Sequence, residues 1–61
     1  MNADELRVII WDYLFRTRAS KTLDEIAAFC GKEPQMITTA VDHEWFKVSA
    51  NNVMIAYGTR L

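Results

Sequence analysis

A capping box followed by a glycine is the feature that most constrains how this chain folds. Thr22 and Glu25 have the Thr-x-x-Glu spacing in which each side chain accepts a hydrogen bond from the other residue's backbone N–H, so a helix can begin at Leu23. Apolar residues then recur at helical spacing, and Gly31 can adopt the left-handed conformation that commonly ends a helix. This pattern predicts a short helix over residues 23–30.

A second short helix is expected immediately after this glycine. Pro34 suits the first turn of a helix, where its missing N–H would have no intrahelical partner. Ile37, Ala40 and Val41 give the following segment one apolar face. The sequence therefore predicts a helix over residues 34–44, joined to the preceding helix by a tight turn and able to project its polar side chains at a partner.

A longer amphipathic segment precedes these two helices. Asn2 and Glu5 repeat the capping-box spacing and predict a helix over residues 3–17. One wide face of this helix is apolar. A second apolar stripe lies roughly opposite and consists of Val8, Trp11 and Phe15. We favour the interpretation that this stripe packs inside the monomer against the strands near the C-terminus. The alternative is a surface for self-association or for a protein partner.

Two strand-like runs follow the third helix. A β-hairpin is predicted over residues 46–57, with Asn51 and Asn52 at its turn, because asparagine tolerates the positive φ that tight hairpins demand. Trp45, just before the hairpin, and Phe46, its first residue, are expected in the core as bulky apolar residues. The predicted fold class is therefore α+β and mainly α, with three helices and a small β-hairpin.

Size and composition limit the remaining choices. With 61 residues, of which 51% are hydrophobic, the chain is expected to form a single domain over residues 1–61. The lone Cys30 rules out a disulfide within the chain and suits a reducing cytosol. No apolar run approaches the ~20 residues needed to span a bilayer. We therefore expect a cytoplasmic protein that does not associate with membranes.

Residues that carry chemistry are scarce. The chain has one histidine and one cysteine, too few for a metal-ligand cluster with zinc spacing. Cys30 is predicted on a buried helix face and His43 on an exposed one, so we do not expect them to form a thiolate–imidazole pair. We expect no enzymatic activity, no metal and no cofactor.

The order of helix, helix-turn-helix and β-hairpin resembles the winged helix-turn-helix family over residues 2–57. The residues that carry the resemblance are Thr22–Ala27, Cys30, Gly31, Pro34, Ile37, Ala40, Val41 and the hairpin. Most domains of that family bind duplex DNA, and a substantial minority are protein-interaction or dimerisation modules. The resemblance thus implies a small DNA-binding protein, such as a transcriptional regulator. The alternative is an interaction or dimerisation module that uses the apolar stripe of the first helix.

The resemblance also implies roles for particular residues. The helix over residues 34–44 would enter the major groove of double-stranded DNA and read base edges with Gln35, Thr38, Thr39 and His43. Phosphate contacts would come from Arg16, Arg18, Lys21, Lys32, Lys47, Asn51 and Asn52, and from backbone N–H groups at the start of the helix over residues 23–30.

The charge balance opposes this function. Seven Lys and Arg residues against eight Asp and Glu residues give a net charge of −1, and Asp42 is predicted on the recognition face. Attraction to phosphates is the general source of affinity for DNA. In this chain that attraction would have to come from the local placement of the cations, because the overall charge does not supply it.

Overall fold

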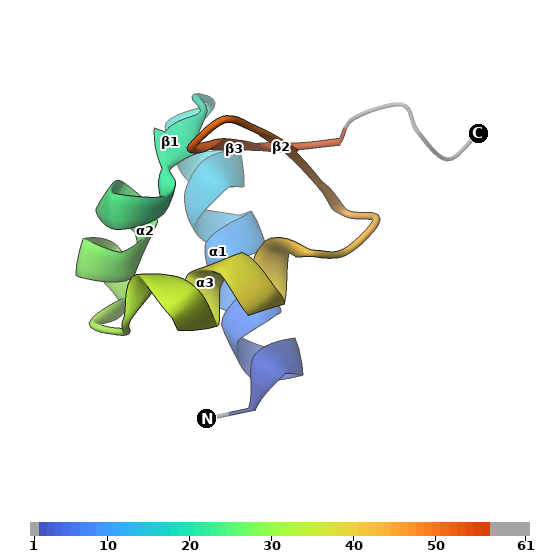
Figure 1. Ribbon diagram of the computed structural model, residues 1–61. Coiled ribbons are helices and arrows are strands. Elements are labelled where there is room, and N and C mark those ends of the chain that lie inside the picture. Colours follow the sequence, from blue (N-terminus) through green and yellow to red (C-terminus); the bar gives the residue numbers. More distant parts are fainter. Residues whose placement is uncertain (1, 57–61) are drawn as a thin grey trace.

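The computed structural model describes residues 2–56 of the chain. Three helices and a three-stranded antiparallel sheet make up this part of the chain (Figure 1). In chain order they are α1 (Ala3–Thr17), β1 (Lys21–Thr22), α2 (Leu23–Cys30), α3 (Pro34–Val41), β2 (Phe46–Ser49) and β3 (Asn52–Ile55). The predicted α+β class is confirmed, and the layout is compatible with a winged helix. Within residues 2–56, no helix is long and apolar enough to cross a membrane.

Both predicted capping boxes form, and they fix where α1 and α2 begin. At α1, the Glu5 N–H donates to Asn2 Oδ1 at 2.8 Å and the Asn2 N–H donates to Glu5 Oε1 at 3.2 Å. At α2, the corresponding distances between Thr22 and Glu25 are 3.1 and 2.8 Å. The two helices have the bounds that the sequence predicts, residues 3–17 and 23–30.

The third helix is shorter than the sequence indicates, so the prediction of a helix as far as Glu44 is wrong. α3 ends at Val41, and Asp42 already has a non-helical backbone with ψ at 73°. The His43 N–H donates to the Val41 carbonyl at 2.8 Å, and the Phe46 N–H donates to the His43 carbonyl at 3.0 Å. These bonds turn the chain towards β2, where Phe46 is buried.

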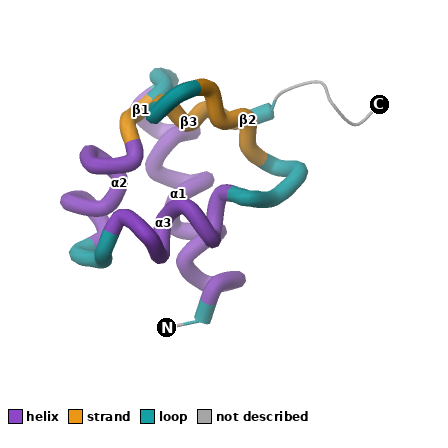
Figure 2. The backbone as a smooth tube through the Cα atoms, in the orientation of Figure 1, coloured by secondary structure: helices purple, strands orange, loops and turns teal. Residues whose placement is uncertain are grey.

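The sheet has the strand order β1-β3-β2 (Figure 2). In the hairpin, Phe46 pairs with Ile55 and Val48 with Val53. β3 ends at Ile55, and Tyr57, the last residue of the predicted hairpin, lies outside the described residues. The residue with positive φ in the turn is Ala50, at 54°. The expectation that an asparagine would adopt this conformation is therefore wrong.

The strand β1 was not predicted, and it ties the hairpin to the helix-turn-helix segment. Lys21 pairs with Val53 and Thr22 with Asn52. The Leu23 N–H, the first of α2, donates to the Asn51 carbonyl at 2.9 Å. The hairpin turn is thus bound to the start of α2 instead of projecting freely.

One hydrophobic core joins all three helices to the sheet. Its buried residues are Leu6, Ile10, Leu14, Ile26, Ala27, Ile37, Ala40, Val41, Phe46, Val53 and Ile55. α3 crosses in front of α1 and also packs against α2 (Figures 1 and 2). The core therefore holds α3 from behind and leaves its other face outward.

Two sequence expectations about apolar residues are wrong. Trp45 is not in the core, because 42% of its surface is exposed. In the second apolar stripe of α1, only Trp11 is packed against the core, while Val8 and Phe15 are exposed. The favoured packing of this whole stripe against the hairpin is therefore not what the structure shows.

Candidate nucleic-acid interface

The outward face of α3 is polar and uncharged. Gln35, Thr38 and Thr39 are exposed on it. The opposite face of the helix is buried and consists of Ile37, Ala40 and Val41. Met36 is apolar but is also exposed. The helix therefore presents the three polar residues of the predicted reading face to solvent.

The two threonine hydroxyls are committed to the helix itself. Thr38 Oγ1 donates to the Pro34 carbonyl and Thr39 Oγ1 donates to the Gln35 carbonyl, each at 3.1 Å. A hydroxyl that donates one bond keeps two lone pairs for accepting others. In this arrangement the threonines can accept from an adenine or cytosine amino group or place a methyl group against thymine.

A groove of about 470 Å³ runs between the end of α3 and β2. Its lining residues are Leu23, Thr38, Thr39, Val41, Asp42, His43, Phe46 and Val48. The structure thus brings Thr38, Thr39 and His43 together at this α3–β2 groove. Gln35 lies apart from it and borders a different hollow with Met36 and the start of α1.

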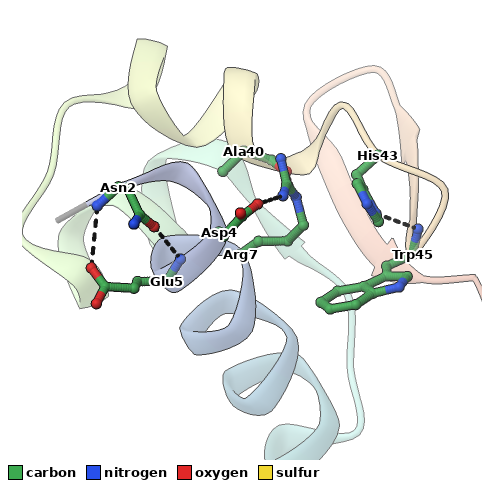
Figure 3. A network of polar contacts seen from close by, with 7 residues as sticks. All are labelled: Asn2, Asp4, Glu5, Arg7, Ala40, His43 and Trp45. Atoms are coloured by element: carbon green, nitrogen blue, oxygen red, sulfur yellow. Dashed lines mark hydrogen bonds and ion pairs between the residues drawn. The ribbon is translucent and has the colours of Figure 1, made fainter.

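His43 lies beyond the end of α3, and its ring is held by Trp45 (Figure 3). The backbone N–H of Trp45 donates to His43 Nδ1 at 3.2 Å, and the two rings meet edge-on with centroids 4.9 Å apart. Because Nδ1 accepts this bond, the neutral ring carries its proton on Nε2. His43 therefore has one N–H left to donate to a ligand.

Arg7 positions α3, a role that the sequence reasoning missed. Its Nε donates to the Ala40 carbonyl at 2.9 Å, and its side chain is only 14% exposed (Figure 3). Ala40 lies in the last turn of α3, where carbonyls have no intrahelical partner. The contact therefore fixes the end of α3 to α1. The only sequence signal was the spacing from Asp4, which binds Arg7 Nη1 at 2.6 Å.

The predicted phosphate contacts on and after α1 are already engaged within the molecule. Arg16 Nε donates to Asp12 at 2.8 Å. The Arg18 guanidinium lies 5.1 Å from the centroid of the Phe15 ring. The Lys21 ammonium lies 5.9 Å from the centroid of the Tyr13 ring. All three cations are at the end of α1 that meets the sheet (Figure 1).

The remaining predicted phosphate contacts are more widely spread. Lys32 lies in the turn between α2 and α3, and Lys47 is exposed on β2 opposite Met54. Asn51 and Asn52 are exposed in and after the hairpin turn. Among the described residues, no lysine or arginine lines the α3–β2 groove.

The start of α2 does not offer the free N–H groups expected for a phosphate. The Leu23 N–H is bound by Asn51, and the Glu25 N–H by the Thr22 hydroxyl. Asp24 and Glu25 also place two carboxylates in the first turn. The Thr22 N–H, which donates to the Glu25 carboxylate, lowers the pKa of that group. Two N–H groups of this first turn are therefore bound within the chain, and the two carboxylates disfavour an anion beside them.

Cys30 is half-buried at the end of α2, and this burial raises the pKa of its thiol. Its side chain packs against the core, as expected for a small apolar residue. In the part of the chain that the structure describes, no group of three or more His, Cys, Asp and Glu residues is placed to hold a metal ion.

No protein-family model, curated protein or solved structure matches the chain.

Proposed function

We propose that this chain is a small DNA-binding protein of the winged helix-turn-helix type, a transcriptional regulator that inserts α3 into the major groove. The observation that carries the proposal is the uncharged polar face of α3, with Gln35, Thr38 and Thr39 exposed. The helix bearing this face is held from behind by the core and at its end by Arg7. A rigid helix with a solvated polar face is what base reading requires.

The side chains on this face suit particular base edges. Gln35 can pair with adenine through two hydrogen bonds. Thr38 and Thr39 present acceptors and methyl groups, which suit amino groups and thymine. His43 adds an Nε2–H donor beyond the end of α3. Asp42, which lines the α3–β2 groove, is repelled by phosphate but can accept a hydrogen bond from a cytosine amino group.

Affinity would come from cations outside the groove. Lys47 lies on the strand that borders it, and Arg18 and Met54 line a hollow at the sheet. Since Met54 is also the cross-strand partner of Lys47, Arg18 and Lys47 both border this exposed residue. With a net charge of −1, we expect weak binding that falls steeply as salt is added.

A backbone amide NMR titration with duplex DNA at low and higher salt tests the proposal. We expect shifts in residues 35–43 and at Lys47 that disappear with salt. Replacing both Thr38 and Thr39 by alanine should weaken binding and relax discrimination between sequences. Thr17→Ala is the matched control, because Thr17 also donates its hydroxyl to its own helix, at Leu14, and should leave binding unchanged.

The titration also separates the proposal from its alternative. No shifts at low salt, or equal losses in the Thr17 control and the α3 variant, would contradict reading by α3. Lys47→Ala should instead weaken binding to all sequences alike. It should also reduce the slope of log binding constant against log salt concentration by about 1. A salt-insensitive partner protein bound through α1 would support the interaction module.

A further inference from the structure

The outward face of α1 carries an apolar patch that the DNA proposal does not use. We define the α1 apolar patch as Val8, Trp11, Phe15 and Trp45. Val8 is 55% exposed and Phe15 38%, although both are large apolar residues. Trp45 comes from the segment between α3 and β2 and completes the patch from the side.

The patch contains both a hollow and an aromatic ring of fixed orientation. The hollow has a volume of about 460 Å³ and is lined by Val8, Trp11, Asp12 and Trp45. Phe15 lies one turn further along α1 and is partly exposed. Its ring stacks on Trp11 with centroids 4.9 Å apart and an interplanar angle of 11°, so its orientation is fixed. A hollow and a fixed ring on one helix face can serve as the two halves of a self-complementary contact.

The net charge along α1 changes from −1 over residues 3–10, with Asp4, Glu5 and Arg7, to +1 over residues 11–18, with Asp12, Arg16 and Arg18. Asp4 and Glu5 lie in its first turn, and Arg16 lies in its last. Arg18 follows as the C-cap, with its guanidinium 5.1 Å from the Phe15 ring centroid. Two α1 helices placed antiparallel therefore set the acidic end of each opposite the basic end of the other, while a parallel arrangement sets like charges together.

We propose that two copies of this chain associate through an antiparallel pairing of their α1 helices. With Val8 of one copy opposite Phe15 of the other, the twofold axis passes between Trp11 and Asp12. The exposed edge of Phe15 of each copy then lies over the hollow of its partner. The same register brings the acidic first turn of each copy to Arg18 of the other. None of the three exposed polar residues of α3 belongs to the patch, but Arg18 and Trp45, which holds His43, border both surfaces. The pairing is therefore tested without DNA.

Analytical ultracentrifugation without DNA over micromolar to millimolar concentrations tests the pairing. We expect a reversible dimer that Val8→Glu and Phe15→Glu each convert to monomer, with unchanged circular dichroism. Because dimerisation stabilises only the folded state, the melting temperature of the wild type should rise with protein concentration and that of the two variants should not. Phe29→Glu is the matched control, because Phe29 is an exposed aromatic residue on α2 that stacks on Tyr13, outside the patch. A wild-type chain that stays monomeric throughout, or a control that dissociates the dimer as strongly, would overturn the proposal.

A charge exchange tests the antiparallel direction. Asp4→Lys and Arg18→Glu should each weaken their own dimer by about three- to tenfold, since each dimer contains the affected contact twice. A mixture of the two variants should restore association, because the mixed dimer has opposite charges at both ends. Native mass spectrometry distinguishes the mixed species. If mixing the two variants does not restore association, the antiparallel arrangement is wrong.

Discussion

Replacing Arg7 tests whether the link between α1 and α3 stabilises the fold. The bond from Arg7 Nε to the Ala40 carbonyl is 2.9 Å long, and the arginine side chain is only 14% exposed. Arg7→Met keeps most of the aliphatic packing but leaves the carbonyl without its donor. A hydrogen bond that involves a charged group contributes about 1.5–3 kcal/mol. The partner Asp4 is 89% exposed, so their ion pair adds little.

We therefore expect Arg7→Met to lower the free energy of unfolding by about 1.5–3 kcal/mol. That is a large part of the ~3–5 kcal/mol that a domain of this size commonly has. Urea denaturation followed by circular dichroism measures it, with an unchanged m-value if only stability changes.

Arg16→Met is the matched control, because it removes the same charge from the same helix. Arg16 is bound to Asp12 at 2.8 Å, but its side chain is 76% exposed. We expect a loss within about 0.5 kcal/mol for this exposed helical pair. If the two variants lose equal free energy of unfolding, or if Arg7→Met leaves it unchanged, the Ala40 contact does not hold α3.

Three further predictions concern caps and the hairpin turn. Thr22→Ala removes the acceptor for the Glu25 N–H and should cost about 1 kcal/mol in chemical denaturation. Ala50→Gly should stabilise the fold by about 0.5 kcal/mol, because Ala50 has φ at 54° and glycine adopts this conformation without steric penalty. The Thr22 N–H lowers the pKa of Glu25 from 4.5. The ionised Glu25 carboxylate therefore stabilises the folded state fully above pH 4.5, and this stabilisation is lost as the pH falls through the lowered pKa. Glu25→Gln should remove this pH dependence, so that the free energy of unfolding changes less with pH below 4.5.

The helix starts were predictable because their determinants are local. The boxes at Asn2 and Thr22 each involve residues only three positions apart. A capping box therefore needs no knowledge of the fold. The exposed face of α3 was predictable for a related reason, since the buried residues Ile37, Ala40 and Val41 recur with the helical period.

The features that the sequence did not show depend on distant contacts. Arg7 and Ala40 are 33 residues apart, and no local pattern indicates which carbonyl an arginine will reach. β1 has two residues, too few for an alternating pattern. α3 ends early because the chain must turn to bury Phe46 in the core, a tertiary requirement that overrides helical periodicity. The α3–β2 groove arises from the same turn.

The bond from the Leu23 N–H to the Asn51 carbonyl also has a consequence for folding. It means that α2 receives part of its N-terminal hydrogen bonding from the hairpin turn, 28 residues further along the chain (51 − 23). A peptide with only the two short helices would lack this bond, and helices of eight residues are too short to persist alone in water. The helix-turn-helix segment and the hairpin should therefore appear in the same kinetic phase of refolding, with no intermediate that contains one without the other.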